Sequence, residues 1–454
     1  MILLSTAIFV LILLFVALLV AGDAAVIYYL LIAYMPVNTL LPEGLPYREA
    51  QALLRFAAGA GTVLFCVLRR VPLRRIFLGD PLSRLLLVWL GAMFLSLVIS
   101  GHYSLWAERS ILRMASYVAV YFVYRTFRWN AARFRHASWV LSTMIFACAL
   151  FALVQVASDS YTPLFDFLHN APPYAEWLGR PPSFLNSGTN AFGGFMGLLL
   201  PFEISLLYLA PHRSAARLFH WAVIIAGFAS VILSGSRGAA LSVTGSCLLA
   251  VLCFSRERRT RIVAVAATAV GLPTLVLLAG VISPRLTHVD EQESVATRYL
   301  LWAEAGQMFL SHPVTGIGVG NFRESYDPEA VAEDPGKVDV HNLYLQLLTE
   351  TGVIGFASFV VLSGHIFRRA ARNLKQFPAH SVAYAVSYAA LAGMLSVLIH
   401  GMVDFFFIGS TEFGAAFGTL LAIFAAIDHE DWAAMPAAPP HTIPNHLGGA
   451  IVLT

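Results

Sequence analysis

Apolar stretches of about 17 to 23 residues follow one another along most of the chain, with short polar connections between them. A helix of that length crosses the roughly 30 Å hydrocarbon core of a bilayer. The stretches are continuously apolar and do not alternate as barrel strands do, and a helix satisfies its backbone hydrogen bonds within itself. They therefore predict an all-α polytopic membrane protein.

Thirteen stretches fit this description in a chain that is 58% hydrophobic and 12% charged. They are 2–20, 24–40, 51–68, 84–100, 109–126, 138–156, 188–209, 218–234, 238–254, 262–283, 343–366, 381–401 and 411–428. Thirteen crossings and a cytoplasmic C-terminus would leave the N-terminus outside. We therefore expect the first forty residues to cross once, which gives about twelve crossings with both ends in the cytoplasm.

The basic residues predict the orientation. Five connections hold 18 of the 29 Lys and Arg residues: 69–75, 125–135, 213–217, 256–261 and 368–375. Basic connections face the cytoplasm in polytopic proteins. The other connections then face outward, and the largest of them, 284–342, contains ten acidic and four basic side chains.

The predicted organisation has six segments. They are N-terminal transmembrane helices (1–157), an outward loop (158–187), further transmembrane helices (188–283), a large outward loop with amphipathic helices (284–342), C-terminal transmembrane helices (343–428) and a disordered cytoplasmic tail rich in Pro and Ala (429–454).

The first polar cluster is "LSGSRGAALS", residues 233–242, where two predicted spans meet in a short outward connection. This connection holds Arg237 at the outer membrane surface among small residues. A guanidinium presents a fixed fork of donors that suits phosphate oxygens. The alternative is an interfacial arginine that reaches toward lipid headgroups.

The second cluster is "VATRYLLWAEAGQMFLSHPVTGIGVGNF", residues 295–322. Apolar residues at helical spacing predict an amphipathic helix on the outer membrane face that stops at "SHP". Arg298 lies in its first turn, where a cation is unfavourable unless an anion is near. That anion is either a ligand or an acidic side chain, with Asp290, Glu291, Glu293 and Glu304 as candidates. "GIGVGNF" follows a helix and lacks the lysine of a phosphate loop, so it predicts a turn.

The third cluster is "VDVHNLYLQLLTETGVIGF", residues 338–356, where the large loop returns to apolar sequence. Asn342 is a good N-cap for a helix that begins near Leu343. His341 then lies at the outer surface, with Tyr344 on the same side of the following helix, and a histidine there can accept a proton near neutral pH. The alternative is a histidine that only caps or anchors the helix. Gly352 and Gly355 indicate close helix packing.

Metal-binding patterns are missing from these clusters. His288, His312 and His341 have no ligand spacing, and the loop acids form no Asp-x-Asp pair. We expect no metal, no other cofactor and no nucleic-acid partner.

The three clusters resemble the motifs of the O-antigen ligase and polymerase superfamily, which are bacterial membrane glycosyltransferases. "HNLYLQLLTETGVIG" fits the family pattern of His, then Asn, Ser or Gln, then nine residues and Gly-x-x-Gly. "RGAAL" fits its Arg-x-x-x-Leu element, and "ATRYLLWAEAG" resembles its arginine-led helix in the large periplasmic loop. "RPPSFLNSGTNAFGGF", residues 180–195, resembles the segment leading into a span that carries an asparagine, here Asn190.

The resemblance implies a GT-C-like helical fold in the bacterial inner membrane. It also implies metal-independent transfer of a glycan from undecaprenyl pyrophosphate to an acceptor hydroxyl on the periplasmic face, with inversion. His341 would be the general base, and Arg237 and Arg298 would bind the pyrophosphate. The candidates for supporting roles are Arg180, Asn190, Asn342, Tyr344 and Asp404.

Three activities share these motifs: ligation of O antigen to lipid A core, polymerisation of repeat units, and transfer of glycan to protein hydroxyls. The ligase is favoured because the His motif and the Arg-x-x-x-Leu element fit it without gaps. A transporter of lipid-linked sugars would instead place ionisable residues along a path through its spans. Few candidates for such a path exist, chiefly Arg55, Glu203 and Asp404, so transport is disfavoured.

Overall fold

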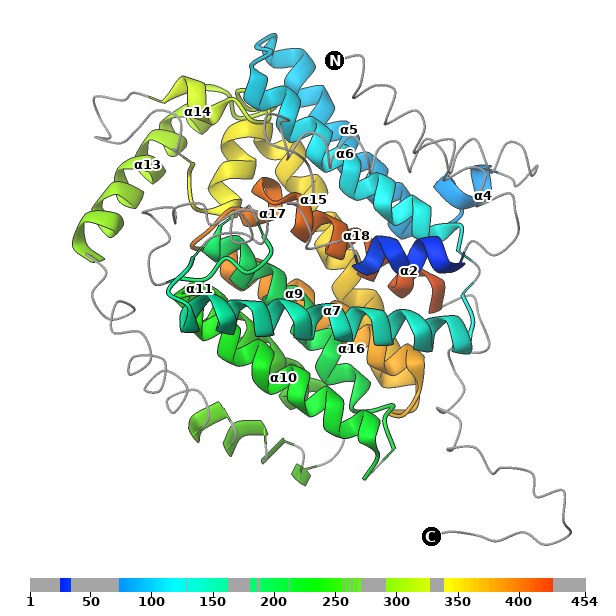
Figure 1. The fold of residues 1–454 in the computed structure, drawn as a ribbon. Helices are drawn as coiled ribbons and strands as arrows, with labels where there is room; N and C mark the ends of the chain where they lie inside the picture. The colour runs from blue at the N-terminus through cyan, green and yellow to red at the C-terminus, as the bar shows by residue number, and fades with distance from the viewer. Residues whose placement is uncertain are drawn as a thin grey trace, which may run out of the picture.

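The computed structural model describes residues 25–33, 73–161, 180–270, 291–326 and 339–427, apart from 128, 186–187, 212, 256–257, 260, 263 and 267. Within these ranges the chain is helical and contains no strand (Figure 1). The described helices include α2 (Ala25–Ala33), α4 (Leu73–Leu78), α5 (Pro81–Ser100), α6 (Leu105–Arg125), α7 (Ala131–Ala157), α9 (Thr189–Leu206), α10 (Ala215–Leu233), α11 (Arg237–Phe254), α13 (Glu291–Ser311), α14 (Phe322–Ser325), α15 (Leu343–Gln376), α16 (Val382–His400), α17 (Phe406–Gly409) and α18 (Thr411–Ala426).

The predicted apolar stretches coincide with helices wherever they are described. Each of the nine stretches from 84–100 to 238–254 and from 343–366 to 411–428 holds one helix. Six described helices, α5, α7, α10, α11, α15 and α16, are long and apolar enough to cross a membrane. The prediction of an all-α membrane protein is confirmed. The number of twelve crossings stays a prediction, because the stretches near the N-terminus and most of 262–283 lie outside the described residues, as does the tail 429–454.

Most long helices begin at a short polar residue whose side chain accepts a hydrogen bond from a backbone N–H of the first turn. These N-caps are Asp80, Ser104, Asn130, Ser214, Ser236, Asn342, Ser381 and Ser410. The side-chain oxygen satisfies a donor that the helix itself cannot pair. The caps therefore set where each helix begins.

The connections gather at two ends of the bundle. One end, called the site end below, holds the α5–α6 and α10–α11 connections, the start of α15 and the end of α16 (Figure 1). The other end holds three basic segments: 125–135 around the start of α7, 213–217 at the start of α10, and 368–375. The last of these was predicted as a connection but forms the final turns of α15, which runs on to Gln376. The segments predicted to be basic and those predicted to carry the site thus lie at opposite ends.

Helices α9 and α16 form the centre of the bundle. In the most apolar window of α16, 78% is buried inside the protein, against 39% for α10, which exposes Leu218 and Ile225. Glycines let α9 approach its neighbours closely: a Cβ at Gly193 would lie 2.6 Å from Ala239 of α11, and one at Gly194 would lie 2.5 Å from Phe406 of α17. The close approach brings the starts of α9, α11 and α17 together at the site end.

Glu203 of α9 is buried in a closed polar cluster. Ser142 of α7 donates to one carboxylate oxygen at 2.7 Å, and His220 Nδ1 of α10 lies 2.6 Å from the other. A buried carboxylate needs such partners because lipid and apolar side chains offer none. The cluster binds three helices together at the level of Glu203.

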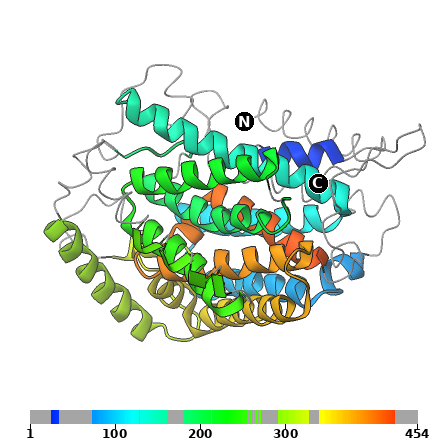
Figure 2. The same ribbon diagram turned by 90° about the horizontal axis from the view of Figure 1, so that it is seen from below.

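Helix α13 stands at the edge of the bundle and packs against α15 (Figures 1 and 2). It ends at Ser311, as the sequence predicts. Its buried side is narrower than the predicted apolar face: Leu301 and Ala305 are buried, whereas Leu300 is 50% and Leu310 is 76% exposed. The reason is that only one edge of α13 meets the bundle, which leaves its other apolar side chains on the surface.

Candidate functional site

Helix α15 is broken at Gly352, whose φ of +60° and ψ of −166° are not helical. The glycine-rich turn, residues 312–320, fills the break, and backbone hydrogen bonds of 2.9 to 3.3 Å run in both directions between turn and helix. The pairs are Ile317 N to Thr349 O, Gly318 N to Glu350 O, Val353 N to Pro313 O and Ile354 N to Val314 O. The turn predicted for "GIGVGNF" is confirmed. Gly352 was predicted to permit close helix packing, and in the structure it also permits the break in α15.

His341 stands just before α15 in a left-handed backbone conformation, with φ of +50°. Asn342 is the N-cap, as predicted, and its Oδ1 accepts from the N–H groups of Tyr344 and Leu345 at 3.0 and 3.1 Å. The Leu343 N–H donates to Gly401 O at 2.7 Å, which ties the start of α15 to the end of α16. The strained backbone is thus held on its C-terminal side by a cap and by a neighbouring helix.

The two ring nitrogens of His341 differ in their surroundings. Nδ1 is buried and makes no hydrogen bond in the described chain, whereas Nε2 is not a buried atom without a partner. The ring meets Phe405 edge-on, with centroids 5.8 Å apart. Of the two nitrogens, Nδ1 is therefore enclosed by the protein and Nε2 is not.

Residues 398–405 connect His341 to a second histidine. Asn342 Nδ2 donates to Met402 O at 3.1 Å, and the Tyr344 hydroxyl donates to Leu398 O at 2.6 Å. His400 is buried, its Nε2 lies 3.4 Å from Ser236 Oγ, and its Nδ1 has no partner among the described residues. No motif in the sequence identified His400; only its four-residue spacing to Asp404 could have suggested it.

Arg180 is fixed by hydrogen bonds from its guanidinium. Nε donates to Ser234 O at 2.9 Å, and one terminal nitrogen donates to Asn190 Oδ1 at 2.7 Å. Asn190 stands in the first turn of α9 and Ser234 ends α10. The structure thereby brings together two predicted supporting residues that are ten positions apart.

Arg180 lies within electrostatic reach of two other arginines, Arg237 and Arg298, and of one carboxylate, that of Asp404. Burial lowers the pKa of Arg180, Asp404 opposes that shift, and Arg237 and Arg298 lower the pKa further. These groups come from four separate segments: the loop before α9, the start of α11, α13, and the turn between α16 and α17. The four groups carry a formal excess of two positive charges, which favours an anion.

Arg237 is the exposed first residue of α11, directly after the N-cap Ser236. The next residue, Gly238, has to be small, because a Cβ there would lie 2.6 Å from Val403 and 2.8 Å from His400. A helix N-terminus carries free N–H groups and a partial positive charge. The start of α11 adds to the anion preference of the arginines.

Asp404 is buried and accepts a hydrogen bond from the Phe405 N–H at 2.7 Å. It therefore lies next to the residue that touches His341, and it also acts on Arg180. All eight predicted site residues lie at the site end. Among the described residues, no three His, Cys, Asp or Glu side chains come together as a metal site.

A family model described as O-antigen ligase matches residues 221–360. The chain contains an O-antigen ligase-related domain. This domain includes Arg237, Arg298 and His341, and it confirms the superfamily predicted from the motifs. Arg180, Asn190 and Asp404 lie outside the matched residues of the ligase-related domain, although Arg180 is within electrostatic reach of Arg237, Arg298 and Asp404.

The ligase-related domain, residues 221–360, supports a function of the O-antigen ligase and polymerase type, and the members of this domain family are glycosyltransferase-like enzymes. Together with the apolar helices it identifies a multi-pass membrane protein. A comparison with curated proteins found no match.

Proposed function

We propose that the protein transfers a glycan from undecaprenyl pyrophosphate to an acceptor hydroxyl, and that it acts as an O-antigen ligase on lipid A core. The observation that carries the proposal is that Arg237 and Arg298 act electrostatically on Arg180 at the end of the bundle that also holds His341. Arginine forks match the geometry of pyrophosphate oxygens and stabilise the charge that grows as the glycosidic bond breaks.

His341 is the general base in this proposal. Its Nε2 takes the proton of the acceptor hydroxyl while the hydroxyl oxygen attacks the anomeric carbon and the bond to the pyrophosphate oxygen breaks. Attack from the side opposite the leaving group inverts the anomeric centre. The imidazolium that forms has a carboxylate near it, because Asp339 lies close enough for electrostatic interaction with His341. A general base contributes roughly 10² to 10⁴-fold to such a step.

The site end faces the periplasm in this proposal. Three basic segments, 125–135, 213–217 and 368–375, lie at the opposite end, and the positive-inside rule assigns that end to the cytoplasm. The isoprenoid chain of the donor then stays in the inner membrane while its pyrophosphate meets the arginines. No step in this scheme requires a metal or another cofactor, since pyrophosphate leaves readily when cations stabilise it.

The ligase is preferred over its relatives because both motifs fit it without gaps. The alternatives are a repeat-unit polymerase and a protein O-oligosaccharyltransferase, which use the same donor and differ in the acceptor. A transporter remains disfavoured because Glu203, the buried carboxylate of α9, is already paired with Ser142 and His220.

Deletion of the coding sequence in the source bacterium, followed by a lipopolysaccharide gel, tests the proposal. Loss of all O antigen with accumulation of its lipid-linked form is expected for a ligase. Core that carries a single repeat would indicate a polymerase instead. An unchanged ladder would contradict any role in O-antigen assembly.

A further inference from the structure

Arg323 of α14 and the buried Asp339, just before α15, form an ion pair close to His341 in sequence. Arg323 Nε donates to one carboxylate oxygen of Asp339 at 2.8 Å, and a terminal nitrogen of Arg323 donates to the other. Two parallel bonds of this kind fix the direction of both side chains. Neither residue was among the predicted site residues.

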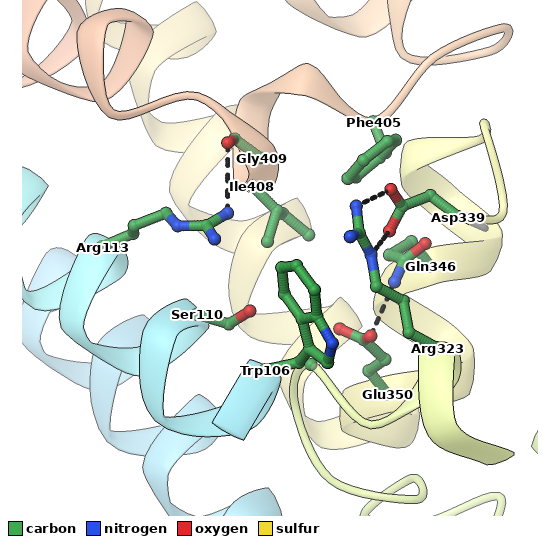
Figure 3. A pocket seen from close by; sticks show the side chains of 11 residues that line it. Trp106, Ser110, Arg113, Arg323, Asp339, Gln346, Glu350, Phe405, Ile408 and Gly409 are labelled. Atoms are coloured by element: carbon green, nitrogen blue, oxygen red, sulfur yellow. Dashed lines mark hydrogen bonds and ion pairs between the residues drawn. The ribbon is translucent and has the colours of Figure 1, made fainter. Parts of the chain in front are cut away.

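Arg323 is also held by an aromatic ring. Its Cζ lies 4.2 Å from the centroid of the Trp106 ring of α6, a distance at which a guanidinium is attracted to the face of an indole. The three side chains line one small pocket, and Figure 3 shows the guanidinium with Trp106 on one side and Asp339 on the other. Arg323 therefore links α6 to the segment that carries His341.

The backbone between the ion pair and His341 is fixed as well. Only Val340 separates Asp339 from His341, and both backbone groups of Val340 are bonded. Its N–H donates to Gln346 Oε1 at 3.2 Å, and its carbonyl accepts from Trp302 Nε1 at 2.9 Å. The strained backbone of His341 is thus held on its N-terminal side too, and the distance from the ion pair to the imidazole is set by the fold.

The charge of Asp339 reaches His341, because the two side chains interact electrostatically. Burial raises the pKa of the Asp339 carboxyl, and Arg323 opposes that shift by favouring the ionised form. A carboxylate close to an imidazole stabilises the imidazolium. Without a partner, this carboxylate would therefore keep His341 protonated and unable to accept the proton of a hydroxyl. Arg323 supplies the partner.

Other charged groups surround the ion pair and the histidine. Arg113 acts on Asp339, Glu350 acts on Arg323, and both Asp404 and Arg298 act on His400. By element they are Arg113 of α6, Arg298 of α13, Glu350 of α15, His400 at the end of α16, and Asp404 in the turn between α16 and α17. These groups are the same in the wild type and in each variant of the pair. A difference between those variants therefore reports the charges of Arg323 and Asp339.

We propose that Arg323 is a positioning residue for the general base: it holds Asp339 beside His341 and balances the charge of that carboxylate, so that the imidazole is unprotonated when the acceptor hydroxyl binds. The carboxylate stays close enough to stabilise the imidazolium once it forms. The inference rests on the proposed function and adds to it a residue that no motif identified.

The test measures the pH dependence of transfer by the full-length protein in nanodiscs, with an undecaprenyl-pyrophosphate-linked glycan as donor and lipid A core as acceptor. Arg323→Gln leaves the carboxylate unbalanced and should move the acid limb of the pH–rate profile, where the base becomes protonated, up by about one pH unit. Asp339→Asn leaves the guanidinium unbalanced and should move the limb down by a similar amount. The double variant loses both charges and should return the limb close to that of the wild type.

A conservative variant and two matched controls accompany these proteins. Arg323→Lys keeps the charge and should keep the wild-type acid limb. Arg75→Gln and Glu324→Gln remove one charge of each sign at exposed positions and should also leave the limb in place. Raising the pH should restore much of the rate of Arg323→Gln, whereas a purely structural role would lower the rate at every pH.

Opposite shifts in the two single variants are the signature of charge balance. Shifts in the same direction, or no shift in either variant, would overturn the proposal. If Arg323→Gln did not fold, because it leaves a buried carboxylate without its partner, Asp339→Asn and the double variant would decide: an unshifted limb in Asp339→Asn would overturn the proposal.

Chemical modification of His341 separates this inference from the proposed function. Diethyl pyrocarbonate reacts with the unprotonated imidazole, and mass spectrometry of the peptide that contains His341 gives the rate at each pH. The midpoint should rise in Arg323→Gln and fall in Asp339→Asn. If it does and the wild type transfers no glycan, the proposed function fails and the charge balance stands. If the wild type transfers glycan and the midpoints do not shift, this inference fails.

Discussion

His341 meets the ring of Phe405 edge-on, with 5.8 Å between the centroids, while its own backbone is held at φ of +50°. A left-handed conformation costs an L-residue other than glycine roughly 1 to 2 kcal/mol. Neighbouring bonds maintain it: Gln346 Oε1 accepts from the Val340 N–H, and Asn342 caps the following helix. Strain at one residue, supported by its neighbours, is typical of positions that serve a site.

The first prediction concerns this strain. His341→Gly should unfold at a higher temperature than His341→Ala, by the equivalent of about 1 kcal/mol, because glycine adopts a positive φ without penalty. Both variants lose the ring contact with Phe405, so that loss cancels. Ala303→Gly, at an exposed helical position, is the control: it should lower the free energy of unfolding by about 1 kcal/mol, because glycine is unfavourable inside a helix. Thermal unfolding in nanodiscs measures all three, and equal midpoints for the two His341 variants would contradict the strain.

The second prediction concerns the break in α15. Gly352→Ala should lower the free energy of unfolding by about 3 kcal/mol or more, because the added Cβ would lie 2.3 Å from Val314 O at a φ of +60°. Gly364→Ala in the same helix meets no atom within 4 Å and should be neutral or slightly stabilising. Urea titration of both proteins checks this. Equal stability of the two variants would show that the break does not depend on glycine.

The third prediction concerns the N-cap of α15. Asn342→Ala should cost about 1 kcal/mol because the Tyr344 and Leu345 N–H groups lose their acceptor. Asn342→Ser should recover most of that stability, since a serine hydroxyl also caps. If alanine were as stable as serine in the same unfolding measurement, the cap would contribute nothing.

The fourth prediction concerns the pyrophosphate site. Arg237→Lys should raise the donor KM or lower the transfer rate about tenfold or more, because an ammonium cannot form the paired bonds of a guanidinium. Arg75→Lys, at an exposed position of α4, should behave as the wild type. Steady-state transfer with an undecaprenyl-pyrophosphate glycan measures the effect. Full activity of Arg237→Lys would favour an arginine that serves only to contact lipid headgroups.

The sequence predicted the helices and the cap well because both depend on local pattern. The apolar length determines the spans, and an Asn before an apolar run determines the start of α15 at Leu343. The turn at 316–322 was also predictable, because the segment follows a helix and lacks the lysine of a phosphate loop. In the structure its three glycines, Gly316, Gly318 and Gly320, all have positive φ.

The contacts between distant segments could not be predicted in this way. Arg180 meets Ser234, and Trp302 donates to Val340, only because α9, α10, α13 and α15 pack as they do. His400 and the pocket around Trp106 belong to no motif, because their neighbours come from several helices. Gly352 was visible as a glycine, but its role depends on a turn some thirty residues earlier.

Transfer by purified His341→Ala protein tests the central claim most directly. Wild-type protein and variant in nanodiscs receive the undecaprenyl-pyrophosphate glycan and lipid A core, and the glycosylated product is measured over time, with Ser358→Ala as the control. The general-base role predicts a rate at least 100-fold lower for His341→Ala with donor binding retained. A variant that transfers glycan at the wild-type rate would contradict the account.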